Sequence, residues 1–150
     1  MLKEGDQAPE IQVQTDTGEN FRLSDLKGKR VVLYFYPKAD TPGCTTESCE
    51  FRDGIEDFAG KGVTVIGISP DNPGAQSKFK KKYDLPFTLL ADEEKTAAQA
   101  YGVWKEKNMY GKKVMGIERT TFVIGPDGKI EKIYGKVKAE GHAAAVLSGL

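Results

Sequence analysis

The strongest constraint on the fold is the most apolar run in the sequence, residues 31–36 (VVLYFY), which stops at a proline. A continuous apolar run of this length indicates a strand that is buried on both faces in a central sheet. Because Pro37 has no N–H group to donate to a neighbouring strand, we expect the strand to end at Tyr36 and the backbone to turn there. Both cysteines of the chain follow within the next thirteen residues.

A helix is expected to begin shortly after this turn. Thr41 followed by Pro42 has the form of an N-cap residue and a proline at the first helical position. We predict a helix from about residue 42 to residue 59, ending at residues 60–62 (GKG). Cys44 then lies in the first turn, where unpaired N–H groups and the positive end of the helix dipole favour a thiolate over a thiol. Cys44 is therefore a candidate nucleophile.

The second cysteine, Cys49, lies five residues further along the same predicted helix. Positions 44, 48, 51, 55 and 58 repeat at helical spacing and put Cys44 on the buried face, whereas Cys49 is about 140° around the helix. Helix geometry separates the two Cα atoms by roughly 8–9 Å, and a disulfide needs about 4.4–6.8 Å. Two interpretations stay open at this point: unrelated reduced thiols, or a pair that bonds only after the first turns unwind.

The residues around Cys44 resemble those of a known family. Pro37, Thr41 and Cys44 match the P-x-x-x-T-x-x-C signature of peroxiredoxins, and Glu47 matches an acidic position often found three residues after the reactive cysteine. A second cysteine five residues downstream is similar to the bacterioferritin-comigratory, or Q-type, subfamily. The resemblance covers essentially the whole chain, with further similar stretches at residues 5–10, 23–29, 102–104 and 119–124.

This resemblance implies a thioredoxin-dependent peroxidase that reduces hydrogen peroxide and organic hydroperoxides, with a role in antioxidant defence and redox homeostasis. Cys44 would attack the peroxide and become a sulfenic acid, which condenses readily with a nearby thiol. Cys49 would supply that thiol once the helix melts locally, giving an intramolecular Cys44–Cys49 disulfide when the protein is oxidised. A dithiol protein, by family resemblance thioredoxin, would then reduce the disulfide.

Attack on a peroxide needs donors for the departing oxygen and an acceptor that orients the substrate. The N–H groups of Gly43 and Cys44 are the expected donors, since glycine lets the backbone approach closely. The Thr41 hydroxyl is the expected acceptor. Pro37 is expected to shield the sulfur from stray water and reductants.

Arg119 and Glu47 complete the expected site. By the resemblance, Arg119 is the cation that favours the thiolate and stabilises charge moving onto the leaving oxygen. The local sequence alone would instead indicate a surface arginine before a strand. Glu47, one turn along from Cys44, would hold Arg119 in place, or alternatively is an ordinary acid near the helix start.

Composition argues against several other classes of protein. The chain has 150 residues, 22 basic and 22 acidic, so its formal net charge is zero and nothing suggests nucleic acid or an anionic membrane as a partner. No apolar stretch is long enough for a membrane span, and the first residues lack an apolar signal core. Two cysteines are too few for a disulfide scaffold. We therefore expect a monomeric cytoplasmic protein in a reducing compartment.

The hydrophobic pattern predicts an α/β fold of thioredoxin-like type, one domain over residues 1–150, with a central mixed sheet flanked by helices and an N-terminal β-hairpin extension. Residues 102–118 are expected to be a loop with an irregular strand. Beyond the elements already given, the pattern predicts a hairpin at 11–14 and 21–23, a helical turn at 24–28, strands at 63–68 and 87–91, helices from 72, 92 and 139, and a second hairpin at 120–124 and 129–134.

Two other functions fit the sequence less well than a peroxidase. A thioredoxin-type disulfide exchanger needs Cys-x-x-Cys and, by resemblance, a proline before the second hairpin, where this chain has Arg119. A metal-binding module would have two cysteines and His142, at most three of the four usual zinc ligands. His142 opens the last helix and is expected to face solvent. No phosphate-cradling or flavin motif is present in the sequence, so no cofactor and no metal are expected.

Overall fold

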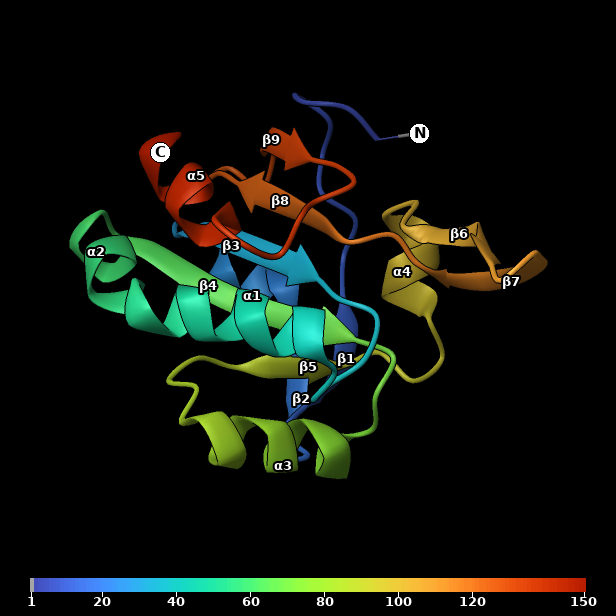
Figure 1. The fold of residues 1–150 in the computed structure, drawn as a ribbon. Helices are drawn as coiled ribbons and strands as arrows, with labels where there is room; N and C mark the ends of the chain where they lie inside the picture. The colour runs from blue at the N-terminus through green and yellow to red at the C-terminus, as the bar shows by residue number, and fades with distance from the viewer. Residues whose placement is uncertain (1) are drawn as a thin grey trace.

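The computed structural model describes residues 2–150, and these build a mixed sheet with helices on both faces (Figure 1). Within this part of the chain, seven strands pair in the order β2-β1-β5-β4-β3-β8-β9, and β6 and β7 form a separate two-stranded sheet. The strands are β1 (Gln12–Thr15), β2 (Asn20–Arg22), β3 (Arg30–Phe35), β4 (Val63–Ser69), β5 (Leu89–Ala91), β6 (Trp104–Met109), β7 (Lys112–Ile117), β8 (Thr120–Ile124) and β9 (Ile130–Tyr134). The α-helices are α1 (Pro42–Asp53), α2 (Ile55–Gly60), α3 (Pro73–Tyr83), α4 (Thr96–Ala100) and α5 (His142–Ser148), and Leu23–Leu26 forms a 3-10 turn.

The strand predicted at residues 31–36 is the central one. β3 pairs in parallel with β4 and antiparallel with β8, so both of its edges are occupied. Strand, helix, parallel strand, and then an antiparallel β8–β9 hairpin followed by α5 is the predicted thioredoxin-like arrangement, which is confirmed. A parallel pair needs a long crossover connection, and α1, α2 and their flanking turns supply it.

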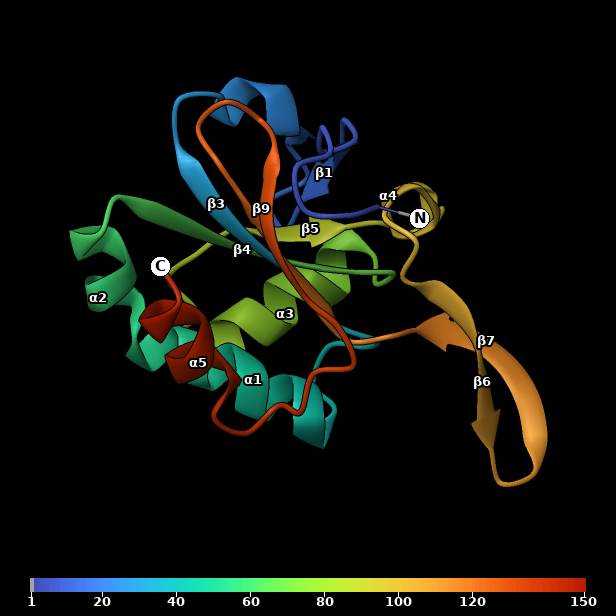
Figure 2. The ribbon, with the colours of Figure 1, turned by 90° about the horizontal axis from the view of Figure 1, so that it is seen from above.

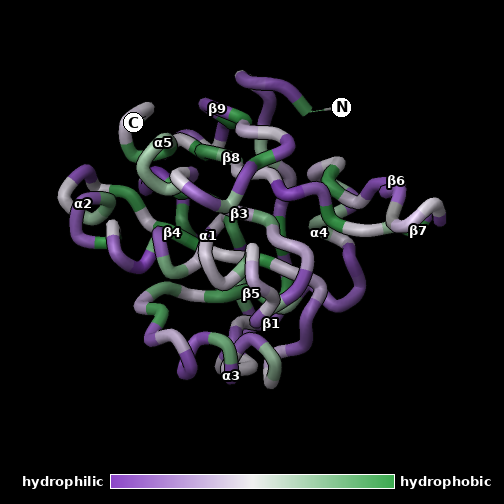
Figure 3. Tube along the Cα trace, in the orientation of Figure 1, coloured by the Kyte–Doolittle hydropathy of each residue, from purple (hydrophilic) through white to green (hydrophobic). Residues whose placement is uncertain are grey.

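Two apolar cores lie on opposite faces of the sheet, because successive side chains of β3 point to opposite sides. One face is covered by α1, α2, α3 and α5, and the other by the N-terminal segment and α4 (Figure 2). Colouring by hydropathy shows the hydrophobic residues along central strands such as β3 and β8 (Figure 3). The side chains of β3 and its extension divide between the cores as Val31, Leu33 and Phe35 on the α4 face and Val32, Tyr34 and Tyr36 on the α1 face.

The single helix predicted over residues 42–59 is wrong in one respect, because it is broken at Gly54 into α1 and α2. Gly54 has φ −95° and ψ 5°, which departs from helical geometry. Glycine costs about 1 kcal/mol relative to alanine in a helix interior, so it is a natural place for the break. The break still lets Phe58 pack against Phe51, with ring centroids 5.6 Å apart.

The loop with an irregular strand predicted over residues 102–118 is wrong in part, because two regular strands form there. This segment forms a regular antiparallel hairpin, β6 and β7, which projects from the body of the molecule (Figure 2). Its turn residues, Tyr110 and Gly111, have φ values of 53° and 77°. Two successive left-handed residues are what a two-residue type I′ hairpin turn requires. The strands were missed because most of their side chains are polar and exposed, which hides the alternation on which strand prediction depends.

The other predicted elements are present, with shifts at their ends. The N-terminal hairpin forms as expected, and β1 joins it to the main sheet by pairing with β5. The helix predicted from residue 92 begins at Thr96, and Asp92 lies before it, its carboxylate accepting from the N–H groups of Ala97 (3.1 Å) and Ala98 (2.9 Å). α5 begins at His142, three residues later than predicted. Among residues 2–150, none of the helices has the length and apolar character needed to cross a bilayer.

Candidate active site

Cys44 lies in the first turn of α1, just beyond the carboxyl end of β3, as the sequence predicts. Thr41 is the N-cap residue with an extended backbone, and Pro42 is the first helical residue. The first backbone bond at this end runs from the Thr45 N–H to the Thr41 carbonyl (2.8 Å). The N–H groups of Gly43 and Cys44 therefore precede the helical ladder and have no intrahelical acceptor. Both N–H groups lie at the N-terminal end of α1, where the helix dipole is positive.

Arg119 reaches this helix from the segment between β7 and β8. Its Nη2 donates to the Sγ of Cys44 at 3.4 Å, and its Nη1 donates to Oε1 of Glu47 at 2.7 Å. The absence of a side chain at Gly43 leaves room for the guanidinium, since a Cβ built there would lie 3.1 Å from Nη2 of Arg119. The structure thus brings together Cys44, Glu47 and Arg119, which are far apart in the sequence.

Glu47 and Arg119 form a buried ion pair that is incompletely satisfied. The Glu47 side chain is fully buried, and its Oε2 has no hydrogen-bond partner among the described residues. Burial raises the pKa of Glu47 to about 7, although the ion pair with Arg119 acts in the opposite direction. Burial lowers the pKa of Arg119, but attraction to Glu47 and Cys44 more than reverses this, so the net change is upward. The guanidinium is therefore held as a cation beside the sulfur.

The turn between β3 and α1 presents the Thr41 hydroxyl. Oγ1 of Thr41 donates to the carbonyl of Lys38 at 2.8 Å and makes no side-chain cap bond to the helix. A hydroxyl has one proton and two lone pairs, so this bond leaves the oxygen able to accept from another donor. Pro37 is half-buried at the start of the same turn.

A partly buried hydrogen-bond network, which the sequence analysis did not predict, holds this turn in place. Oδ2 of Asp71 accepts from the N–H of Ala39 (2.8 Å) and from the hydroxyl of Ser69 (2.6 Å). Gln76 donates to Ser69 Oγ (2.8 Å) and accepts from the hydroxyl of Tyr36 (2.6 Å). The sequence signal for this network is the pair of polar residues at the end of the buried strand β4, Ser69 and Asp71. Because the carboxyl ends of parallel strands meet at one edge of a sheet, these residues lie beside the turn that follows β3.

Comparison with known proteins assigns the family. A model of the AhpC/TSA family matches residues 4–133. The chain belongs to the AhpC/TSA family. A putative peroxiredoxin Bcp of Coxiella burnetii is 52% identical over 149 residues, covering 99% of each chain. Peroxiredoxin Bcp of Bacillus subtilis is 51% identical over 146 residues, covering 97% of this chain and 93% of its own.

A solved structure agrees with the relatives. The bacterioferritin comigratory protein of Xanthomonas campestris, solved in connection with its alkyl peroxide reduction activity, superposes with a TM-score of 0.88 at 39% identity, covering 93% of this chain and 88% of its own. The protein is thus a peroxiredoxin of the Bcp or Q type and a peroxidase. The resemblance inferred from residues around Cys44 is confirmed.

In this peroxiredoxin Cys49 lies away from Cys44 on the surface of α1. Both cysteines are free thiols, with Cys44 buried and Cys49 half-buried. The predicted buried face of the helix is confirmed at Ser48, Phe51 and Phe58, which are buried, whereas Ile55 is only partly buried. α1 is joined to its surroundings by a bond between Ser48 and the Tyr34 hydroxyl (2.8 Å).

The expectation that His142 faces solvent is wrong. His142 is 6% exposed, and its Nε2 lies 2.7 Å from Oγ1 of Thr121. Burial, together with the charge of Arg119, lowers the pKa of His142 to about 4. The start of α5 packs on α1. The rings of Phe51 and His142 lie edge to face there, with their centroids 5.9 Å apart, and this packing encloses the imidazole.

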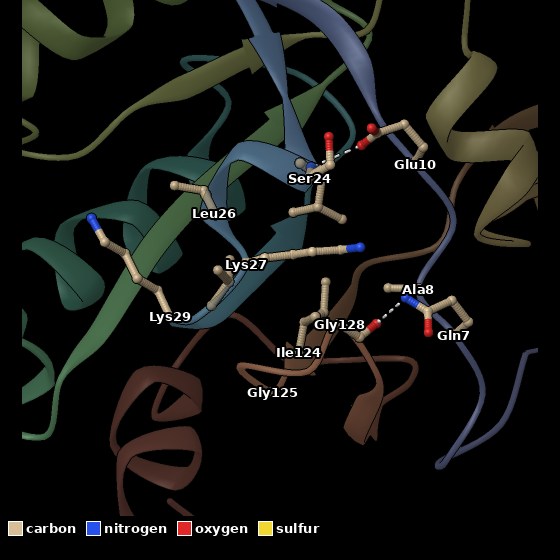
Figure 4. A pocket seen from close by; sticks show the side chains of 12 residues that line it. Gln7, Ala8, Glu10, Ser24, Leu26, Lys27, Lys29, Ile124, Gly125 and Gly128 are labelled. Atoms are coloured by element: carbon tan, nitrogen blue, oxygen red, sulfur yellow. Dashed lines mark hydrogen bonds between the residues drawn. The ribbon is translucent and has the colours of Figure 1, made fainter.

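The peroxiredoxin also has a cavity of about 250 Å³ that is separate from this site (Figure 4). It lies between the N-terminal segment, the turn before β3 and the β8–β9 turn, and the side chain of Lys27 extends across it. Nε2 of Gln7 donates to the Gly128 carbonyl at its edge (3.1 Å). Val31 lines it at the start of β3, whereas Cys44 lies beyond the other end of that strand. A strand of this length spans roughly 20 Å, so the cavity is remote from the sulfur.

Proposed function

We propose that the peroxidase reaction takes place at Cys44, with hydrogen peroxide and organic hydroperoxides as substrates. The observation that carries this proposal is the contact of Arg119 Nη2 with Cys44 Sγ at a helix N-terminus that also offers two N–H groups without intrahelical acceptors. The related Xanthomonas protein reduces alkyl peroxides, which supports the inclusion of organic substrates. Cationic and dipolar groups aimed at a sulfur favour its anionic form.

The chemical step follows from these positions. The Cys44 thiolate attacks one peroxide oxygen, so that an S–O bond forms while the O–O bond breaks and its electron pair goes to the leaving oxygen. Arg119 and the N–H groups of Gly43 and Cys44 stabilise the negative charge on that oxygen. The Thr41 hydroxyl accepts from the protonated peroxide oxygen and orients it, while Pro37 limits access of water to the sulfur. The peroxide proton passes to the leaving oxygen, which departs as an alcohol or water, and the Cys44 sulfenate takes a proton from solvent to become a sulfenic acid.

Glu47 acts in this proposal as a positioning residue. Its carboxylate holds Nη1 of Arg119, which leaves Nη2 directed at the sulfur. Because a guanidinium presents its donors in a fixed plane, restraining one nitrogen also orients the other.

We further propose that Cys49 resolves the sulfenic acid. Its thiol attacks the Cys44 sulfur, an S–S bond forms, and the oxygen leaves as water. The helical spacing of roughly 8–9 Å between the Cα atoms requires the first turns of α1 to unwind before this bond can form. Weak helix formers support such opening, since Gly43, Thr45 and Thr46 each cost up to roughly 1 kcal/mol relative to alanine. This makes the enzyme an atypical two-cysteine peroxiredoxin.

A dithiol protein, thioredoxin by family resemblance, is the proposed reductant of the exposed disulfide. Turnover then depends on a compartment that supplies reducing equivalents, which is consistent with a cytoplasmic protein. We propose that the chain works as a single domain and as a monomer, since both cysteines of the cycle lie on one helix.

Three variants test the cycle in an assay of peroxide consumption with thioredoxin, its reductase and a nicotinamide reductant. Cys44→Ser is expected to abolish turnover. Cys49→Ser is expected to undergo the first oxidation at the wild-type rate but to stall before recycling, with a trapped sulfenic acid visible by intact mass. Glu56→Ala, an exposed position on α2, is the control and keeps both steps. Full activity in Cys44→Ser would refute the proposal, and undiminished recycling in Cys49→Ser would refute the intramolecular disulfide.

A further inference from the structure

The β6–β7 hairpin carries a half-buried lysine, Lys107, whose side chain lies over Gly116, three residues before Arg119. Lys107 stands opposite Val114 in the hairpin register, and Gly116 lies two residues further on the same face of β7. A Cβ built at Gly116 would lie 3.3 Å from Cδ, 3.5 Å from Cε and 3.8 Å from Nζ of Lys107. The lysine therefore crosses over Gly116, which has no side chain to prevent it. Gly116 is only three residues before Arg119, a reach of about 10 Å even for an extended chain.

The electrostatics of Lys107 agree with this placement. Burial lowers the pKa of Lys107, and the charge of Arg119 lowers it further, whereas Cys44 and Glu118 act in the opposite direction. Arg119 and Cys44, the two partners of the contact described above, thus both act on this ammonium. The neighbouring Lys105 is already paired with Glu118 at 2.7 Å, while Lys107 has no ion pair among the described residues. Lys112 and Lys113 at the tip of the hairpin also have no ion pair among the described residues, but they are exposed, whereas Lys107 is half-buried over Gly116.

The ammonium of Lys107 can balance the negative charges at the proposed site. Above about pH 7, where Glu47 is ionised, a Cys44 thiolate and Glu47 place two negative charges around the single positive charge of Arg119. A hydroperoxide that carries its own negative charge is repelled by that surplus, and a neutral one is not. Lys107 brings the sum to zero, and clefts of the appropriate sign raise the association rates of charged substrates about tenfold or more.

We propose that Lys107 is a specificity-determining residue that admits anionic hydroperoxides, such as those bearing a carboxylate, to Cys44. This inference rests on the proposed role of Cys44. The ammonium attracts the carboxylate as the peroxide group enters beside Arg119, and the bond changes at the sulfur are those already described. Hydrogen peroxide and uncharged alkyl hydroperoxides gain little from Lys107 because they carry no charge.

The test uses two substrates that differ only in charge, linoleic acid hydroperoxide and its methyl ester. Rates of Cys44 oxidation are measured by stopped flow on the full-length reduced protein. Lys107→Met is expected to lower the rate constant for the acid about tenfold and to change that for the ester less than about twofold. Lys107→Arg keeps the charge and is expected to restore the preference. Added salt should shrink the acid-specific loss, because it screens the attraction.

Two further variants make the result decisive. Lys113→Met removes a charge from the other face of the same hairpin and is expected to leave both rate constants unchanged. Gly116→Val keeps the lysine but displaces its side chain, so it should reproduce the acid-specific loss. Equal losses for acid and ester in Lys107→Met, or no loss for either, would overturn the inference. A wild-type protein whose Cys44 reacts with neither substrate would instead refute the proposed function.

Discussion

Nη2 of Arg119 lies 3.4 Å from Sγ of Cys44, although 75 residues separate the two positions in the sequence. The contact joins a loop between β7 and β8 to the first turn of α1, and Glu47 fixes it by binding the other guanidinium nitrogen. The reactivity proposed for Cys44 therefore depends on a charge delivered from another part of the fold as well as on the local helix terminus.

Replacing Arg119 by methionine should slow peroxide reduction far more than it affects folding. The variant loses the cation beside the sulfur, and removing one such donor typically costs about 10²–10³ in rate. Stopped-flow oxidation of Cys44 by hydrogen peroxide measures the effect, with Arg30→Met as control because Arg30 pairs with Glu131 at the surface. A loss of similar size in both variants would contradict a specific role for Arg119.

Gly43→Ala should reduce activity without destabilising the protein. The new methyl group would lie 3.1 Å from Nη2 of Arg119 and displace the guanidinium, whereas alanine is intrinsically better than glycine in a helix by about 1 kcal/mol. We expect roughly tenfold slower oxidation of Cys44 at equal or higher stability.

α3 offers a matched control for this change. Gly74 follows Asn72 and Pro73 as Gly43 follows Thr41 and Pro42, so Gly74→Ala makes the same substitution at a second helical position remote from the sulfur. Its Cβ meets Oδ1 of Asn72 at 3.4 Å, which is an acceptable contact. If Gly43→Ala and Gly74→Ala had equal rates of oxidation, the displacement of Arg119 would not matter.

Glu50→Ala should speed disulfide formation. Oε1 of Glu50 accepts from the N–H of Gly141 at 2.9 Å, a bond that joins α1 to the start of α5 and opposes unwinding. Losing about 1 kcal/mol of restraint should raise the rate of Cys44–Cys49 bonding roughly fivefold while leaving sulfenic acid formation unchanged. Quenched-flow mass spectrometry follows both steps, and Glu56→Ala on α2 is the control. Slower disulfide formation in Glu50→Ala would argue against opening of α1.

Glu47 should make the reduced protein less stable as pH rises. Its pKa is about 7 in the fold against an ordinary 4.5, so between these values the unfolded chain releases the proton first. Stability is then lost from about pH 4.5 to 7, by about 3 kcal/mol, and is unaffected by this group above that range. Glu47→Gln should remove that loss, as urea midpoints measured at about pH 5 and 8 would show. An unchanged pH slope would contradict the raised pKa.

His142 should act in the opposite direction over nearly the same range. Its pKa is about 4 in the fold against an ordinary 6.5, so the unfolded chain takes up the proton first as pH falls. Stability is lost between about pH 6.5 and 4, again by about 3 kcal/mol. His142→Gln, which keeps a partner for Thr121, should lose this acid sensitivity in the same urea titration. Since the two groups oppose each other, the wild-type profile should be flatter than that of either variant.

The sequence by itself determined the centre of the fold and the position of Cys44 at the start of a helix. An apolar run that ends at Pro37, followed by Thr41 and Pro42, is enough to place a buried strand, a turn and a helix whose first turn contains Cys44. These predictions succeeded because strand burial, proline geometry and helix capping act between residues that are close in sequence.

Only the tertiary structure decided what surrounds the sulfur. The contact with Arg119, the burial of His142 and the path of Lys107 over Gly116 each join segments that are not neighbours in the chain. Periodicity predicted neither the break at Gly54 nor the exposed β6–β7 hairpin, because packing and turn geometry override weak local preference there. Because charges interact through space, the charges acting on Cys44 could be identified only from the tertiary structure.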